Sequence, residues 1–172
     1  MSAREPLAVA VLTFNCEGVI GETLAQARRL CARPFVVDSH STDRTVEIAR
    51  AAGCEVVQRP FKNYADQRNW AVAQLEGRAV WQLHLDADEV LDDTAVGEIA
   101  RIVADPQAPH RAYMLRRIDY FMGRRLRFSG VNPWHLRLFR SGHGACENRL
   151  YDQHFVADAP AARLRGCMHD KN

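Results

Sequence analysis

The chain has 172 residues, a formal net charge of +2 at pH 7 and 47% hydrophobic residues. This length suits one domain with a sizeable core, and the composition is that of an ordinary globular protein, which excludes the disordered and fibrous classes. So small a net charge does not argue for nucleic-acid binding by the chain as a whole.

The cysteines and the N-terminal segment indicate a compartment. The five cysteines are odd in number, lie far apart and include no Cys-x-x-Cys pair. This pattern favours free thiols in a reducing compartment and argues against zinc. The apolar run at residues 7–14 is too short for a membrane span and lacks the cleavage site of a signal peptide. We therefore expect a cytoplasmic protein, with attachment to a membrane surface left open.

Strands and helices are expected to alternate four times in the first 105 residues. The expected strands are residues 8–13, 35–38, 55–57 and 79–85, and the expected helices are residues 20–31, 42–52, 63–75 and 93–104. Ser41 is a credible N-cap of the second helix, and Asp43 is placed to favour its dipole. This alternation predicts an α/β fold, a Rossmann-type, mostly parallel sheet flanked by helices.

Polar residues follow three of the expected strands. Asn15 and Glu17 follow the first strand, Asp38 ends the second, and Asp86 and Asp88 follow the fourth. In parallel α/β sheets, ligands bind at these carboxyl ends. In an extended backbone Asp86 and Asp88 project from one face, and two carboxylates there call for a cation, most simply a divalent metal with an anionic ligand. Taken alone, the pair favours the alternative of an acidic loop that leads into a helix capped by Asp92 or Asp93.

The pattern changes after the fourth helix. Residues 112–121 and 135–139 are predicted to be longer strands, with a turn at residues 122–123 and no clear helix between them. We expect a mixed, irregular C-terminal part on the same sheet, within a single domain of residues 1–172. Residues 167–172 contain no recognisable terminating element, which is compatible with a chain that is part of a longer polypeptide.

Four short motifs occur in order along the chain. They are Thr13-Phe14-Asn15-Cys16-Glu17, Val37-Asp38-Ser39-His40-Ser41-Thr42-Asp43, Gln67-Arg68-Asn69 and Leu85-Asp86-Ala87-Asp88-Glu89. In order and separation they resemble the family 2 glycosyltransferases of the GT-A fold, most of all the bacterial branch that builds lipopolysaccharide core and exopolysaccharide. The resemblance covers about residues 7–155. It implies that residues 1–105 bind a nucleotide sugar and that residues 106–172 form the acceptor side.

The resemblance implies roles in nucleotide-sugar binding. Residues matching Thr13, Asn15 and Glu17 line the nucleotide pocket. The residue matching Asp38 hydrogen-bonds the base, and a turn or capping aspartate is the alternative. The residue matching Arg68 faces the diphosphate or ribose, where its guanidinium offsets phosphate charge. A solvated helix arginine is the alternative for Arg68.

Asp86 and Asp88 match the family's Asp-x-Asp. The resemblance implies that Asp86 contacts the ribose, or the metal through water, and that Asp88 ligates Mn²⁺ or Mg²⁺ between the two phosphates. Such a metal neutralises the nucleoside diphosphate as it leaves. His84 is expected to be a core histidine, and Glu89 is expected to point to the other face.

An inverting transfer also needs a base that takes the acceptor hydroxyl proton. Related sequences often carry Glu-Gly-Arg-x-x-His-Glu where this chain has Glu-Asn-Arg-Leu-Tyr-Asp-Gln-His. With Glu147 and Arg149 in register, the His-Glu pair falls on Asp152 and Gln153, and an amide cannot act as a base. Asp152 is therefore the first candidate and Glu147 the second. Loop carboxylates paired with nearby arginines are the alternative for both.

Residues 120–128 mix cations with aromatic side chains, and Trp134 follows. A solvated basic face, an acceptor site for a phosphorylated sugar or lipid-linked saccharide, and a contact with a membrane surface are three interpretations. Nucleic acid is not expected, because no recognised binding motif is present.

These observations favour a metal-dependent glycosyltransferase of the hexosyltransferase type. It would move a sugar, with inversion, from a nucleoside-diphosphate sugar, above all a UDP-sugar, to a saccharide or lipid-linked acceptor in cell-surface polysaccharide synthesis. A sugar-nucleotide nucleotidyltransferase is an alternative, although the Gly-rich loop that grips a nucleoside triphosphate is absent from the front of the chain. A non-catalytic nucleotide-sugar-binding module is another.

Overall fold

The computed structural model describes residues 4–122, 124–126, 132–149 and 153–171. The strands of its large sheet are β1 (Glu5–Thr13), β2 (Phe35–Asp38), β3 (Glu55–Gln58), β4 (Ala79–Asp86), β5 (Glu89–Leu91), β6 (Ala112–Phe121), β7 (Arg124–Arg125), β8 (Trp134–Arg140) and β11 (Ala162–Asp170). A separate hairpin pairs β9 (Gly144–Cys146) with β10 (Phe155–Ala157). The helices are α1 (Ile20–Leu30), α2 (Thr45–Ala51), α3 (Tyr64–Leu75) and α4 (Asp93–Ala104).

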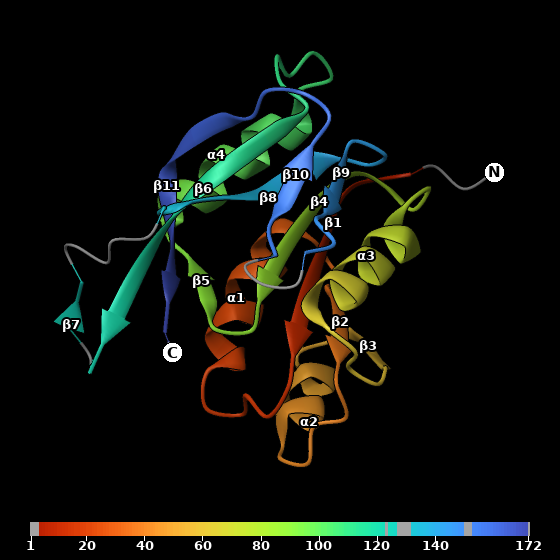
Figure 1. The fold of residues 1–172 in the computed structure, drawn as a ribbon, viewed down its shortest axis with the longest axis vertical. Helices are drawn as coiled ribbons and strands as arrows, with labels where there is room; N and C mark the ends of the chain where they lie inside the picture. Colours follow the sequence, from red (N-terminus) through yellow and green to blue (C-terminus); the bar gives the residue numbers. More distant parts are fainter. Residues whose placement is uncertain (1–3, 123, 127–131, 150–152, 172) are drawn as a thin grey trace.

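The large sheet has the order β3-β2-β1-β4-β8-β6-β11-β5, with β7 paired to β6 (Figure 1). The strands β3, β2, β1 and β4 are parallel, as predicted from the alternation of apolar strands and helices. Beyond β4 the sheet becomes mixed, because β8 is antiparallel to both β4 and β6. The expected α/β fold with a mixed C-terminal part on the same sheet is confirmed.

Helices cover both faces of the sheet. Helices α1, α2 and α4 pack on one face, where Leu24 and Ile99 join strand residues such as Val11 and Leu85 in the main core. Helix α3 packs on the opposite face of β1 and β2, and its N-terminal half also contacts the β9–β10 hairpin. This arrangement leaves the carboxyl ends of β1, β2 and β4 between α3 and the turn that follows β4 (Figure 1).

The helix starts show where local sequence was sufficient. Asn63 caps α3 by accepting a hydrogen bond from Asp66 N at 2.8 Å, at the predicted start of that helix. The prediction of Ser41 as N-cap of the second helix is wrong. Helix α2 begins at Thr45, three residues after the predicted start, because the backbone N–H and hydroxyl of Ser41 both donate to the carboxylate of Asp38 instead.

Strand β11 is a strand that the sequence analysis did not predict. It lies inside the sheet, parallel to β6 and antiparallel to β5. Its sequence alternates as a half-buried strand should, since Leu164, Gly166 and Met168 are buried whereas Arg163 and Arg165 are exposed. The alternation of arginines with other residues in this segment indicates a strand. The sequence analysis missed it because the apolar stretch of the segment is short.

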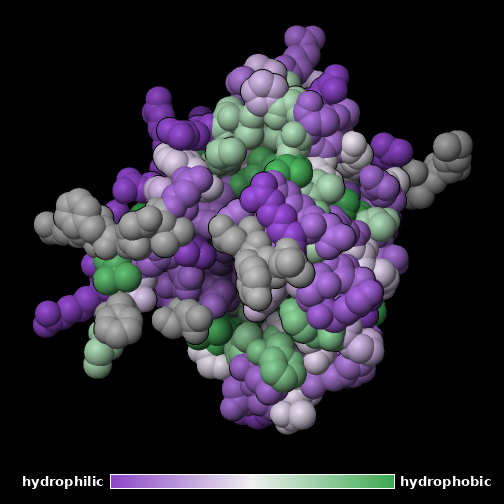
Figure 2. All heavy atoms as spheres, in the orientation of Figure 1, coloured by the Kyte–Doolittle hydropathy of each residue, from purple (hydrophilic) through white to green (hydrophobic). Residues whose placement is uncertain are grey.

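The face of the molecule that is seen in Figure 2 is mainly polar. Figure 2 shows one face on which hydrophilic residues dominate and apolar residues form small, separate patches. All five cysteines are free thiols. Within the described ranges, no helix combines the length and the apolar character that crossing a membrane requires. The large apolar side chains exposed among the described residues are Phe14, Phe61, Tyr64, Val80, Met122, Leu126 and Val156.

Candidate active site

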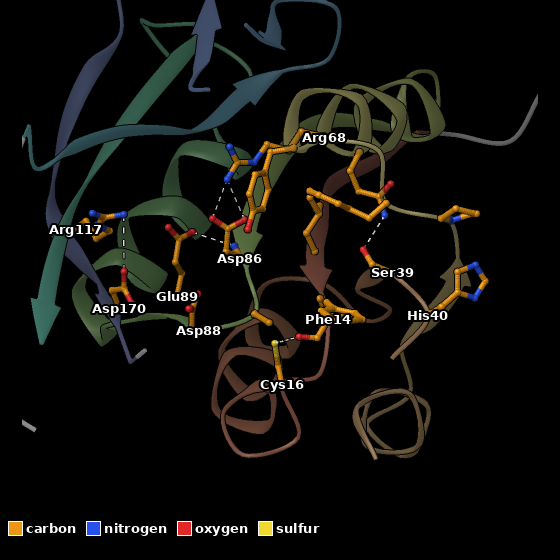
Figure 3. Close-up of a pocket in the computed structure, with 17 residues that line it drawn as sticks. Phe14, Cys16, Ser39, His40, Arg68, Asp86, Asp88, Glu89, Arg117 and Asp170 are labelled. Carbon is orange, nitrogen blue, oxygen red and sulfur yellow. Dashed lines mark hydrogen bonds and ion pairs between the residues drawn. The ribbon is translucent and has the colours of Figure 1, made fainter. Parts of the chain in front are cut away.

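A pocket of about 610 Å³ lies at the carboxyl ends of β1, β2 and β4, where the strand order predicts a ligand site. Figure 3 shows its two ends. Phe14, Ser39 and His40 line one end, whereas Arg117 of β6 and Asp170 of β11 line the other. Between them lie residues from α3, from the end of β4, from the turn after it and from the start of β5, namely Arg68, Asp86, Ala87, Asp88 and Glu89.

Asp86 is held by two arginines. Arg68 Nη2 lies 2.9 Å from Asp86 Oδ2 and 3.2 Å from Oδ1, and Arg137 Nη2 lies 3.3 Å from Oδ2. Burial acts to raise the pKa of this carboxyl, but the two guanidinium groups outweigh it and lower the pKa below its usual value. Asp86 is therefore an anion with a fixed position at the end of β4.

The prediction that Glu89 points to the other face is wrong, because Glu89 lines the same pocket as Asp86. Residues 87 and 88 form a turn rather than a continued strand, so the two-residue alternation ends at Asp86. The Glu89 carboxylate folds back, accepting Asp86 N at 3.0 Å through Oε2 and Arg137 Nη2 at 2.5 Å through Oε1. Burial, and after it the charge of Asp86, raises the pKa of Glu89 to about 7 although Arg137 opposes the shift.

Asp88 lies on the same pocket, half-buried and beside Asp170. Burial raises its pKa, and the negative charges of Asp170 and Asp86 raise it further. A cation at this point would relieve that repulsion. Among the described residues, Asp88 thus makes none of the arginine ion pairs that hold Asp86.

The donor set around Asp88 fits a divalent cation only in part. Carboxylate oxygens of Asp88 and Asp170 are ligands of the type that Mg²⁺ and Mn²⁺ accept, and Mg²⁺ usually completes its shell with water and phosphate oxygens. Among the described residues, no three His, Cys, Asp or Glu side chains meet in a ready cation site. The described carboxylates alone therefore do not complete a metal site, and a divalent cation here would need further ligands from a bound phosphate group or water.

Arg68 is buried rather than solvated, which removes the alternative considered for it. Besides Asp86, its guanidinium donates through Nη1 to the backbone oxygen of Gln153 at 2.8 Å. Its charge also lies 5.3 Å from the ring centre of Tyr64. Arg68 borders the pocket, so a phosphate there would compete with Asp86 for the same guanidinium.

Thr13 carries a buried hydroxyl at the end of β1. Within the described part of the chain, its Oγ1 has no hydrogen-bond partner, and the residue lines the pocket. An unpaired buried hydroxyl is costly unless a ligand or water completes it. This observation supports the prediction that the Thr13 segment contacts a ligand.

The other predicted nucleotide residues hold the loops that surround the pocket. The Asp38 carboxylate accepts hydrogen bonds from Ser41 N at 2.9 Å and from Gln58 Nε2 at 3.0 Å. Asn15 Oδ1 accepts Thr42 N at 2.8 Å, and Glu17 Oε2 accepts the backbone N–H of the residue before α2 at 3.0 Å. These three are not among the described pocket-lining residues, and their nucleotide contacts stay predictions.

The structure describes only one of the two candidate bases. Asp152 lies outside the described residues. Glu147 is half-buried, and its Oε2 lies 2.7 Å from Nε of Arg149, which is the ion pair considered as its alternative role. It is not among the described residues that line the pocket. The identity of the base therefore stays a prediction.

Three kinds of site residue were missed. Arg137 interrupts the apolar strand β8, and a charge in a buried strand is a signal that a partner is required. Phe61 and Tyr64 form an exposed edge-to-face pair at 5.1 Å beside the cap of α3, which helix periodicity does not reveal. Asp170 was missed with its strand β11.

Residues 8–162 match the family model described as Glycosyl transferase family 2. An uncharacterized glycosyltransferase of Rickettsia bellii is 32% identical over 161 residues, which cover 93% of this chain and 50% of that protein. One of Rickettsia typhi is 31% identical over 114 residues, 66% of this chain and 38% of that protein. The chain thus spans half or less of the length of these curated relatives.

Solved structures share the fold. Staphylococcus aureus TarS 1-349 superposes with a TM-score of 0.56 at 21% identity, covering 78% of this chain and 47% of that one. Its complex with UDP gives 0.51 at 25% identity, with 69% and 37% covered. Mycobacterium tuberculosis glucosyl-3-phosphoglycerate synthase, solved with Mn²⁺, UDP and glucosyl-3-phosphoglycerate, gives 0.50 at 20% identity, with 68% and 44% covered. The predicted GT-A-like fold is confirmed.

Proposed function

The chain belongs to glycosyl transferase family 2, and from this membership we propose that it moves a sugar from a nucleoside-diphosphate sugar, above all a UDP-sugar, to a saccharide or lipid-linked acceptor with inversion. The observation that carries the proposal is the strand-end pocket. It brings Thr13, Arg68, Asp86 and Asp88 to one cavity from three separate motifs. TarS and the mycobacterial synthase were each solved with UDP, which supports a uridine nucleotide as the first donor to test.

The polarity of the pocket suggests how a donor lies in it. Phe14, His40 and Phe61 offer apolar and aromatic surface at one end, which suits a nucleoside. Arg68 and the carboxylates after β4 occupy the middle, which suits the diphosphate with its counter-ion. The sugar would then face the end formed by Arg117, where β6 and β11 belong to the acceptor-side half.

The residues of the chain have separate tasks in this proposal. Asp88, with Asp170 beside it, would hold Mn²⁺ or Mg²⁺, and the bound metal would neutralise the diphosphate leaving group. Arg68 and Arg137 hold Asp86 in its ionised form at the end of β4. An acceptor hydroxyl would lose its proton to a carboxylate of the acceptor-side half, with Asp152 first and Glu147 second.

The cellular setting is part of the proposal. We assign the chain to cell-surface polysaccharide synthesis, in the cytoplasm or at the inner face of the membrane. Residues 1–105 and 106–172 would act as donor and acceptor sides of one domain. The single large sheet supports this, because β8, β6 and β11 of the second half lie between β4 and β5 of the first.

A thermal-shift screen tests the donor site. UDP, GDP, dTDP, CMP and ATP would each be added with and without Mn²⁺. We expect one nucleoside diphosphate with Mn²⁺ to raise the Tm by roughly 5 to 10 °C at about a hundred times its Kd, since such binding adds about 2.7 kcal/mol. Asp88→Asn should remove the metal-dependent part of the shift. Glu76→Gln, which neutralises an exposed carboxylate beyond the end of α3, should keep it.

The outcomes separate the competing functions. Stabilisation by a triphosphate alone would favour a nucleotidyltransferase, and the absence of any nucleotide effect would refute both enzymes. Product analysis with the matching sugar donor and candidate acceptors then distinguishes transfer from simple binding. A chain that binds the donor but forms no glycoside with any acceptor would be a nucleotide-sugar-binding module.

A further inference from the structure

The side chain of Asn69 joins α3 to the hairpin of β9 and β10. Its Nδ2 donates to the backbone oxygen of Cys146 at 2.9 Å, and its Oδ1 accepts the backbone N–H of the same residue at 2.8 Å. One amide thus satisfies both backbone groups of Cys146, as a neighbouring strand would. Asn69 and Cys146 are 77 residues apart in the sequence, so the pair is a tertiary contact.

Gln153, two residues before β10, makes the second connection between the hairpin and α3. Its Oε1 accepts the backbone N–H of Ala65 at 2.6 Å, in the first turn of α3. This N–H is one of those that a helix cannot satisfy within itself. The side-chain Nε2 of Gln153 also donates to the backbone oxygen of Arg149. The hairpin therefore supplies a cap to α3 from 88 residues away.

The same hairpin reaches the active site through Arg68. The Arg68 guanidinium donates to the backbone oxygen of Gln153 through Nη1 and to Asp86 through Nη2. The main chain of Gln153 is therefore bonded to the group that is bonded to Asp86. In addition, the ring of Phe155 in β10 lies 5.6 Å from the Arg68 guanidinium and 4.9 Å from the ring of His84 in β4.

Neither amide has a role in the donor pocket. Asn69 and Gln153 are not among the described pocket-lining residues, and both spend their donors and acceptors on backbone groups across the interface between α3 and the hairpin. Packing of Phe155 and Cys146 against α3 would bring the hairpin near the helix. Apolar contacts are not directional, so the paired hydrogen bonds to named backbone atoms add a constraint on register that packing alone lacks.

We propose that Asn69 and Gln153 are positioning residues that hold the β9–β10 hairpin in register against α3, whose Arg68 bonds both Gln153 and Asp86, so that acceptor-side groups meet the donor correctly. The inference rests on the proposed glycosyltransferase function and deepens it. It assigns α3 two tasks, since Arg68 serves the donor site while its neighbour Asn69 serves the hairpin. Loss of either amide should then impair transfer more than donor binding.

Alanine variants test the proposal with two separate readouts. Asn69→Ala and Gln153→Ala should each lower kcat by roughly 10- to 100-fold, since a displacement of about 1 Å is sufficient for such a loss. The Kd for the nucleoside diphosphate, measured by calorimetry, should change by less than about threefold, because the donor contacts remain. Hydrogen exchange of residues 144–149 should accelerate in both variants.

Conservative and control variants separate positioning from general damage. Gln153→Glu keeps an oxygen for Ala65 N and places a negative charge at the start of α3, where the helix dipole favours it, so hydrogen exchange of residues 144–149 should stay close to the wild-type rate. Gln74→Ala removes an exposed amide from the same helix and should match the wild type in every readout. The double variant Asn69→Ala/Gln153→Ala should be little slower than the worse single variant, because both amides hold one hairpin.

Wild-type kcat in Asn69→Ala and Gln153→Ala would overturn the inference, and so would a loss of kcat that only follows the loss of donor affinity. Unchanged hydrogen exchange at residues 144–149 would show that the amides do not hold the hairpin. A wild-type chain that transfers no sugar from any donor refutes the proposed function instead. In that case the exchange measurement still tells whether the amides position the hairpin, since it needs no substrate.

Discussion

At the scale of single residues, the site is a buried cluster of opposite charges. Arg68 and Arg137 face Asp86 and Glu89, and the four side chains balance formally when both carboxyls are ionised. Removing one partner from such a cluster leaves an uncompensated charge, which is far more costly than losing a surface ion pair. Besides burial, the cluster also lowers the pKa of His84, because the positive charges of Arg137 and Arg68 disfavour a protonated imidazole beside them.

His84 should make stability depend on pH. Burial, followed by the charges of Arg137 and Arg68, lowers the pKa of His84 to about 3. In the unfolded chain this imidazole takes up a proton below about pH 6.5, while the folded chain keeps it neutral. The stabilising contribution is therefore present above pH 6.5 and is lost as the pH falls towards 3, by about 1 kcal/mol per pH unit.

Urea unfolding of the wild type and His84→Gln at pH 7.5, 6.5, 5.5 and 4.5 measures this effect. The free energy of unfolding of the wild type should fall more steeply below pH 6.5 than that of the variant. Glu89, with its pKa raised to about 7, acts in the opposite sense between pH 4.5 and 7, so the difference between the two proteins is the quantity to compare. Equal slopes would contradict a neutral buried imidazole.

At the scale of elements, β11 and α4 are fitted to one another. Glu98 of α4 accepts the backbone N–H groups of Arg165 and Gly166 at 2.9 and 3.0 Å, and Asp92 accepts that of Cys167 at 3.1 Å. The same Asp92 caps α4 by accepting Ala95 N at 2.7 Å. The side chains of Glu98 and Asp92 thus fix the position of β11 along α4. The two elements approach each other closely at Gly166.

Gly166→Ala should destabilise the protein. A Cβ at this position would overlap the backbone of Ala95 in α4, and backbone cannot move as a flexible side chain does. We expect a loss of about 2 to 3 kcal/mol in the free energy of unfolding, measured by urea denaturation. Gly97→Ala is the matched control, since nothing lies within 4 Å of its Cβ and helix propensity should add about 1 kcal/mol. A neutral Gly166→Ala would show that α4 and β11 can separate.

At the scale of the whole molecule, strand β6 extends beyond its neighbours and carries β7 as a projecting arm (Figure 1). Met122 is 87% exposed and Leu126 42% exposed near the tip, and Arg124 and Arg125 lie between them in sequence, also exposed. Arginines flanked by exposed apolar side chains favour an anionic lipid surface over a neutral one. This arrangement supports the proposed membrane contact.

Vesicle sedimentation tests that contact. Wild-type chain should bind vesicles rich in anionic lipid and not neutral ones. Arg124→Gln/Arg125→Gln should weaken binding about tenfold or more, since each basic residue near such a surface contributes about 1 kcal/mol. Arg33→Gln/Arg50→Gln removes the same charge from exposed sites before β2 and in α2, and should bind like the wild type. Absence of wild-type binding to anionic vesicles would exclude this contact.

The sequence by itself determined the features that depend on near neighbours. The apolar runs of β1, β2 and β4 and the helical periodicity between them predicted the parallel half of the sheet. Asn63 marked the start of α3, because a cap acts within one turn. Four motifs predicted a donor site at the strand ends, and Thr13, Arg68, Asp86 and Asp88 do line one pocket there.

Only the tertiary structure decided which partners these residues have. Asp86 meets Arg137 from 51 residues away, and Arg68 meets Gln153 from 85 residues away, and no local pattern encodes such distances. The turn at residues 87 and 88 brought Glu89 to the pocket. Side chains alternate between faces only in an extended strand, and this turn interrupts the strand. The tertiary structure also decided that residues 162–170 form strand β11. A short alternating segment is stable as a strand when neighbouring strands bond its backbone, and β6 and β5 do so here.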